Sequence, residues 1–126
     1  MKTLLIGLGG ALGSIARYQL DGWCQRWLGP SFPYGTLAVN LIGSFLLALL
    51  MHVGLTTERV PPILRIALAT GVLGGFTTYS TFSYETFRYL QNSAWTAAIA
   101  NVLATVLGCL AAAFLGWMAG RFLVGA

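Results

Sequence analysis

The sequence predicts an all-α membrane protein with four transmembrane helices in a single domain, residues 1–126, and three observations support this. Hydrophobic residues make up 57% of the chain and charged residues only 8%, whereas soluble domains average about 25% charged residues. The mean hydropathy is +0.78. Polar and turn residues also divide the chain into four apolar stretches, and about 20 mostly apolar residues suffice for a helix to cross a bilayer.

The four predicted spans follow one another with short connections. They cover residues 3–23, 35–53, 62–90 and 94–123. Proline, glycine and polar residues fill the connections at residues 29–33, 56–61 and 91–93, as is typical of turns. A signal peptide is an alternative for the first apolar run, but the three further spans favour a retained first helix.

The first span contains a glycine run, residues 7–13, that has the spacing of a dinucleotide-binding loop. That motif needs a strand before it and an acidic residue about 20 positions later, and the sequence context supplies neither. Close helix packing explains these glycines better, because small residues four apart let helices approach each other. Such pairs occur at Gly9 and Gly13, Gly71 and Gly75, and Gly116 and Gly120.

Two polar residues lie within the first and second spans. Arg17 is deep in the first span, where an arginine costs about 2.5–3.5 kcal/mol on insertion scales. We expect it to hold an anion or a carbonyl, or to extend toward the membrane surface. Asn40 lies six residues into the second span, and its amide offers donors and an acceptor. We expect Asn40 either to link two helices or to face a pore as a hydrogen-bond donor.

The third span is interrupted by small and hydroxyl residues at positions 71–83. Irregular backbone within a bilayer is tolerated only where protein buries it or where it lines a watery cavity. This break therefore marks a candidate site for permeation or ion binding. The carbonyls of Gly74 and Thr77 there are candidate cation ligands.

After the break, aromatic and hydroxyl side chains are combined on one predicted helix. Tyr79 and Phe82 are three residues apart and share a helix face. The edge of an aromatic ring carries partial positive charge and can contact an anion. With the hydroxyls of Ser80 and Thr81, these rings suit a small, strongly hydrated anion that exchanges water for protein donors.

The remaining ionisable residues do not suggest catalysis. Glu85 either pairs with Arg88 at helical spacing or borders the mouth of a pore. His52 is the only histidine, and no combination of nucleophile, base and orienting group is found around it. We therefore expect no enzyme activity.

The basic residues are dispersed, which excludes the clustered positive surface that binds nucleic acid. Four spans place both termini on one side of the membrane. That side carries Lys2, Arg59, Arg65 and Arg121. The other side carries Arg26 and Arg88, with Arg17 as a third if its side chain extends that way. This weak bias predicts insertion in both orientations. A chain this short encloses little by itself, so we also expect an oligomer.

At these motifs the sequence closely resembles the Fluc/CrcB family of fluoride channels. The resemblance rests on residues 74–83 (GGFTTYSTFS), residues 33–40 (PYGTLAVN) and the pair Gly13 and Arg17. It covers nearly the whole chain in length, number of spans and order of motifs. One departure is Tyr79, which stands where the best-known members carry phenylalanine and which adds a phenol hydroxyl.

The resemblance implies a dual-topology homodimer with antiparallel subunits and two fluoride pores at their interface. It implies a structural Na⁺ at the dimer centre, bound by the backbone carbonyls of Gly74 and Thr77 from both subunits. The pore residues that it implies are Arg17, Asn40, Tyr79, Ser80, Thr81, Phe82 and Glu85. Asn101 and Thr105, four apart on the fourth helix, align more loosely as pore-lining residues.

The predicted function is passive export of fluoride across the inner cell membrane, by a multi-pass protein embedded in lipid. The acid HF enters cells and dissociates, and a selective anion leak lets the trapped ion leave. The alternative is a small proton-coupled exporter of organic cations, which needs a carboxylate deep in a helix. None of the acidic residues is clearly central in a predicted span; they are Asp21, Glu58 and Glu85. A third class, a membrane subunit that does not transport, leaves the break unexplained.

Overall fold

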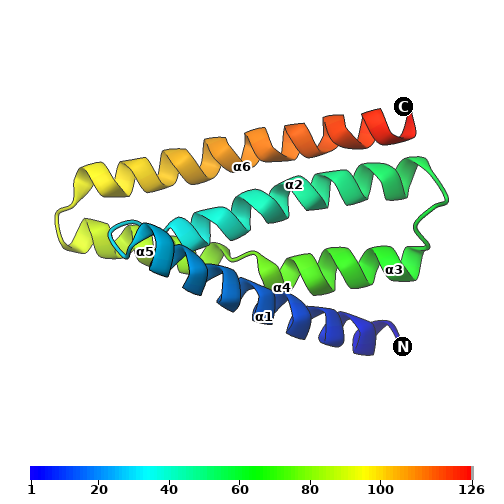
Figure 1. Cartoon of the computed structure of the whole chain (residues 1–126), viewed down its shortest axis with the longest axis horizontal. Helices are drawn as coiled ribbons and strands as arrows, with labels where there is room; N and C mark the ends of the chain where they lie inside the picture. Colours follow the sequence, from blue (N-terminus) through cyan, green and yellow to red (C-terminus); the bar gives the residue numbers. More distant parts are fainter. Residues whose placement is uncertain (126) are drawn as a thin grey trace.

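The computed structural model describes residues 1–125, which form helices and short connections with no strand among them. The predicted domain ends at Ala126, which lies outside the described residues. The chain makes four helical passes that alternate in direction, so that both ends of the chain lie at the same end of the bundle (Figure 1). The all-α class is therefore confirmed.

Three of the passes are continuous helices, and the third is divided. The continuous helices are α1 (Lys2–Leu28), α2 (Tyr34–Thr56) and α6 (Trp95–Val124). The third pass consists of α3 (Pro62–Ile66), the π-helix η1 (Ala67–Leu73), α4 (Gly74–Phe76) and α5 (Tyr79–Gln91). Proline at the first position of α3 and Gly125 in the left-handed region after α6 are typical helix boundaries.

Thr77 and Thr78 separate α4 from α5 with extended backbone. The amide of Thr77 closes the preceding turn on the carbonyl of Leu73 at 3.0 Å. The hydroxyl of Thr78 then caps α5 by accepting a hydrogen bond from the amide of Thr81 at 3.3 Å. This is the bond that an N-cap threonine makes, so the local sequence explains where α5 begins.

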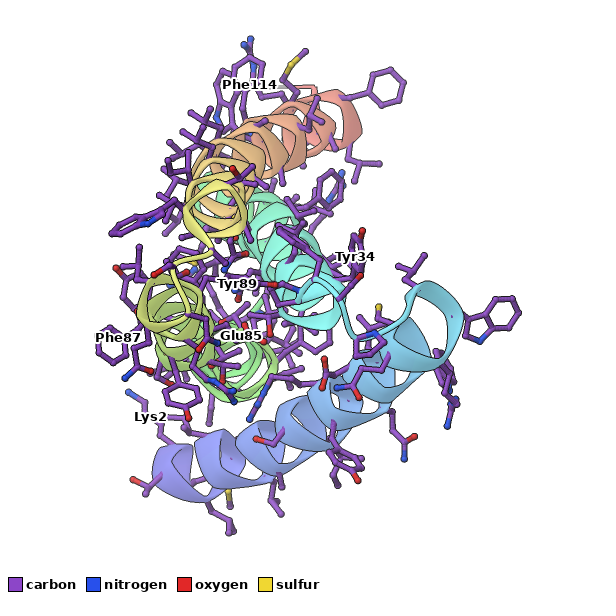
Figure 2. The ribbon with its side chains drawn as sticks, turned by 90° about the vertical axis from the view of Figure 1, so that its left-hand side faces the viewer. Lys2, Tyr34, Glu85, Phe87, Tyr89 and Phe114 are labelled. Carbon is purple, nitrogen blue, oxygen red and sulfur yellow. The ribbon has the colours of Figure 1, made fainter. Side chains whose placement is uncertain are left out.

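Two of the helices in residues 1–125, α2 and α6, are long and apolar enough to cross a membrane. The first predicted span, in α1, is long enough, but polar residues such as Arg17 and Gln19 make it less apolar. The third predicted span falls short because its helices are individually brief. Large apolar side chains such as Phe87 and Phe114 project away from the bundle (Figure 2). An apolar exterior of this kind suits a lipid environment.

Glycines let α1 approach the first half of the third pass, as their spacing predicted. A Cβ atom added at Gly9 would lie 2.8 Å from the carbonyl oxygen of Ala67, and one at Gly75 would lie 2.6 Å from that of Gly10. Gly116 lies in the same way against the backbone of Phe45, where α6 packs on α2. The close-packing interpretation of the glycine pairs is therefore confirmed.

We predict that Gly9→Ala destabilises the protein by about 1–3 kcal/mol, because its methyl group has no space against η1. The control is Gly7→Ala on the same helix, where an added Cβ meets nothing within 4 Å. That control should be neutral or stabilising by up to about 1 kcal/mol. The free energy of unfolding in mixed micelles measures both. Equal effects of the two substitutions would contradict the packing interpretation.

Candidate functional site

Most of the predicted site residues line one groove, a cavity of about 510 Å³ formed by α2, η1, α4, α5 and α6. The groove also includes apolar residues of α2 and α6, such as Leu47 and Leu110. The predicted residues in the groove are Asn40, Gly74, Thr77, Tyr79, Phe82 and Thr105. Residues far apart in sequence therefore converge where α4 ends and α5 begins.

Asn40 is bonded to the backbone between α4 and α5. Its amide nitrogen donates to the carbonyl of Thr78 at 3.0 Å, and its amide oxygen accepts from the Thr78 N–H at 2.9 Å. Gly43, one turn later on α2, leaves space for the methyl group of Thr77. These two bonds replace the hydrogen bonds that a continuous helix would provide to Thr78. They are needed because Asn40 is only 8% exposed, and backbone groups buried beside it require protein partners. The structure thus shows Asn40 as a link between helices as well as a groove residue.

Two carbonyls at the break, those of Gly74 and Thr77, lack their helical donors. The Thr78 N–H would reach the carbonyl of Gly74 in a continuous helix, but it bonds to Asn40 instead. The N–H of Thr81, which would likewise reach the carbonyl of Thr77, bonds to the hydroxyl of Thr78. Within residues 1–125, no hydrogen bond reaches the carbonyls of Gly74 or Thr77. Unpaired carbonyl oxygens are hard ligands that suit a cation such as Na⁺. The residues present therefore fit the metal site that the resemblance implies.

Tyr79 and Phe82 lie together at the groove, with ring centroids 5.6 Å apart and planes inclined by 64°. This is an edge-to-face arrangement, and it confirms that they share a helix face. Phe82 is 6% exposed, whereas Tyr79 is 80% exposed on this single chain. Phe82 is therefore enclosed by its own chain, and Tyr79 extends to its surface.

Thr105 contributes a hydroxyl to the groove from α6. Its oxygen is buried and makes no hydrogen bond among the described residues. A buried hydroxyl without a partner is costly, and in a groove it is available to a bound water or ion. This finding places the more loosely aligned Thr105 beside Asn40 and Phe82.

Arg17 lies in a second cavity of about 300 Å³, between α1, α2 and the start of α5. Its Nε donates to the carbonyl of Gly75 at 3.1 Å. Binding to a carbonyl was one of the alternatives predicted for Arg17. Thr81 lines this cavity too, and Thr78 lines both this cavity and the groove. The extended backbone therefore forms a wall shared by two polar spaces.

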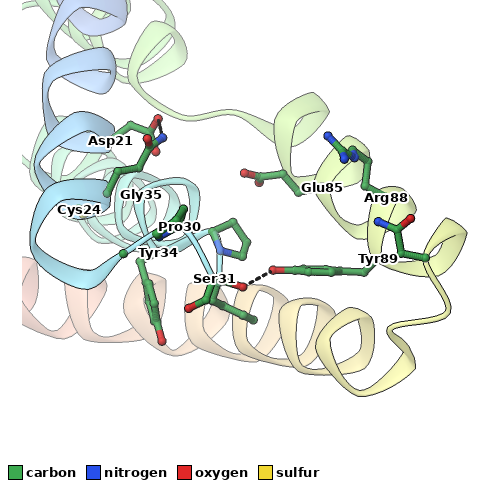
Figure 3. Close-up of a pocket in the computed structure, with 14 residues that line it drawn as sticks. Asp21, Cys24, Pro30, Ser31, Tyr34, Gly35, Glu85, Arg88 and Tyr89 are labelled. Atoms are coloured by element: carbon green, nitrogen blue, oxygen red, sulfur yellow. Dashed lines mark hydrogen bonds between the residues drawn. The ribbon is translucent and has the colours of Figure 1, made fainter.

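Glu85 lines a third cavity of about 370 Å³ (Figure 3). This cavity lies between the C-terminal parts of α1 and α5 and the connection at residues 29–33. Thr36 donates to Glu85 Oε2 at 3.1 Å, while Oε1 is buried and has no hydrogen-bond partner within residues 1–125. Among the described residues, the side chain bonded to Glu85 is that of Thr36 and not that of Arg88. The border of a pore mouth stays a prediction for Glu85. Tyr89 closes the cavity by donating to the Ser31 carbonyl at 3.2 Å.

Two candidate residues do not join these cavities. Ser80 is exposed and lines none of them. Asn101 is 1% exposed and donates to the hydroxyl of Thr86 at 2.9 Å instead of lining the groove. Sequence reasoning missed Thr36 and Thr78 as site residues. The position of Thr36, one turn before Asn40, was the available signal, because it puts both on one helix face.

Comparisons with known proteins identify similar sequences over nearly the whole chain. Residues 4–117 match the family described as CrcB-like protein, Camphor Resistance (CrcB). A protein of Sorangium cellulosum (strain So ce56), named "Fluoride-specific ion channel FluC", is 53% identical over 119 residues, 94% of each chain. Proteins of the same name are 56% identical in Anaeromyxobacter dehalogenans (strain 2CP-1 / ATCC BAA-258), over 98% of each chain, and 54% identical in Geobacter metallireducens (strain ATCC 53774 / DSM 7210 / GS-15), over 98% of this chain and 99% of the relative.

Proposed function

The chain belongs to the CrcB family, and from this premise we propose that it is a fluoride channel that exports the ion passively down its electrochemical gradient. The observation that carries the proposal is the identity of 53–56%, over at least 94% of each chain, to proteins named fluoride-specific ion channels. Such export protects a cell from the fluoride that enters as HF. Channels of this kind are not enzymes.

The polar groups of the groove supply the chemistry that fluoride needs. Fluoride is small and strongly hydrated, and it leaves water only where donors replace its hydration shell. The free hydroxyl of Thr105, the second amide N–H of Asn40 and the edge of the Phe82 ring are such groups in one groove. The guanidinium of Arg17 raises the local affinity for anions in the adjoining cavity, beside the hydroxyl of Thr81.

The organic-cation exporter, the alternative function, lacks support. The named relatives are fluoride channels. Asp21 and Glu85 line the end cavity together with the connection at residues 29–33, and the central groove contains neither carboxylate.

In our proposal, two antiparallel subunits form a multi-pass homodimer in the inner membrane, with two pores. The groove supports this, because Tyr79 is 80% exposed on a single chain and Gly74 is exposed beside it. A second subunit would cover these residues and narrow the groove into a pore. Insertion in both orientations is supported by the small difference in basic residues between the two ends.

Na⁺ fits the carbonyls of Gly74 and Thr77 and would lie at the dimer centre, where each subunit supplies both ligands. A monovalent cation there satisfies polar groups that would otherwise be unpaired in an apolar environment. Its contribution is structural in this proposal, because it neutralises the carbonyl dipoles and so holds the start of α5 in place.

We predict that the purified protein in liposomes releases fluoride rapidly and chloride little, as measured with ion-selective electrodes. Asn40→Asp should reduce fluoride release by at least about tenfold, because a carboxylate repels the anion and cannot donate to Thr78. Phe82→Ile should also reduce release, because it removes the ring edge from the groove.

Protein-free liposomes and a check that each variant is folded are the controls for these measurements. Absence of fluoride release from folded wild-type protein would overturn the proposed function. Wild-type release from a folded variant would remove that residue from the pore.

We predict that insertion in both orientations places the N-terminus on either face of the membrane. A fusion tag at Met1 should be accessible to a membrane-impermeant label in about half of the molecules in sealed vesicles, because the charge bias is weak. Detergent-opened vesicles give the total. Labelling of all or none of the molecules in sealed vesicles would contradict dual topology.

We also predict that replacing Na⁺ with a bulky organic cation destabilises the dimer, because the carbonyls of Gly74 and Thr77 lose their ligand. The dimer fraction by size-exclusion chromatography and the unfolding midpoint should both fall, and both should recover when Na⁺ returns. If neither changes after exhaustive dialysis, the carbonyls hold no structural Na⁺.

A further inference from the structure

A chain of two hydrogen bonds connects α6 to the backbone of Phe82. Asn101 Nδ2 donates to Thr86 Oγ1 at 2.9 Å, and Thr86 Oγ1 donates to the carbonyl of Phe82 at 2.9 Å. Asn101 and Val39 are the two largest side chains that are almost completely buried in this chain. Asn101 therefore lies inside the protein, and its side chain does not line the groove.

α5 needs such an anchor because it is separated from the rest of its pass. The extended residues Thr77 and Thr78 interrupt the helical hydrogen bonds on its N-terminal side. Asn40 fixes that end, and α5 packs mainly on α6 along the remainder of its length. An apolar contact alone allows a helix to rotate or slide, whereas a buried hydrogen bond has one geometry.

We infer that Asn101 is a positioning residue, which acts through Thr86 to fix the rotation of α5 and hence the place of the Phe82 ring in the groove. This inference rests on the proposed function, in which the groove is the path of fluoride. Thr105, one turn from Asn101 on α6, lines the groove directly. One face of α6 thus both supplies a groove hydroxyl and holds the opposing aromatic ring.

A positioning residue and a pore-lining donor differ in how they depend on Thr86. A donor that contacts the ion acts independently of Thr86, whereas a positioning residue acts only through it. Substitution of either partner should then have the same effect, and substitution of both should add little further.

The experiment compares Asn101→Leu, Thr86→Val, the double variant and Thr86→Ser, which keeps the hydroxyl. Fluoride release per folded protein should fall about tenfold in each single variant, because the aligned position of α5 is less populated. The double variant should fall by about the same factor, and Thr86→Ser should stay near wild type. Thr96→Val on α6 is the matched control, because Thr96 is exposed and makes no hydrogen bond through its side chain in the described chain.

Hydrogen exchange gives a readout that does not depend on transport. Amides of α5 should exchange faster in Asn101→Leu and Thr86→Val, while those of α2 should not change. A double variant reduced about a hundredfold, or normal release from Thr86→Val, would overturn the inference. Unchanged exchange in α5 would overturn it as well. Failure of the wild type to release fluoride would instead count against the proposed function, and the two failures are thus distinguishable.

Discussion

The pairing of the Asn40 amide with both backbone groups of Thr78 is the interaction on which the rest of the site depends. An interrupted helix in apolar surroundings leaves a donor and an acceptor unpaired, and each costs free energy. A carboxamide has both complementary groups on one planar end, so one side chain satisfies the two. The same contact fixes the start of α5 against α2 and releases the Gly74 carbonyl from helical bonding. The break beside the groove and the free carbonyl of Gly74 follow from it. The carbonyl of Thr77, in contrast, is free because the Thr81 N–H bonds to the hydroxyl of Thr78.

Much of this arrangement was predictable from the sequence, because the responsible patterns are local. Low charge and four apolar stretches indicated a helical membrane protein, and small residues four apart indicated where helices approach. The residues after the break were recognisable as a site because hydroxyls are costly within a bilayer. Tyr79 and Phe82 were placed on one face by helical spacing alone, which the edge-to-face contact confirms. Asn40 and Thr105 reach the same groove from other helices.

The remaining features depend on packing between helices, which local patterns do not specify. Arg17 had several acceptable partners, and the approach of α1 to α4 decides that Gly75 is the one. Ser80 and Thr81 are adjacent, and the rotation of α5 after the two extended residues that precede it decides that Thr81 lines a cavity while Ser80 is exposed.

Two further side chains have partners on other helices that the sequence did not indicate. Asn101 has the spacing of a groove residue, yet its amide donates to the neighbouring Thr86. Glu85 had a basic residue at helical spacing, but the hydroxyl of Thr36 on another helix is its partner.

The open groove also bears on how the protein is made and retained in a cell. Acyl chains cannot hydrogen-bond, so the free carbonyls of Gly74 and Thr77 and the buried hydroxyl of Thr105 are poorly tolerated in a chain that stands alone in lipid. In the proposed dimer a second subunit would cover these groups, so a newly inserted chain would lack partners for them until it meets another. The amount of assembled protein would then rise more steeply than the rate of synthesis, because assembly in that proposal requires two chains to meet.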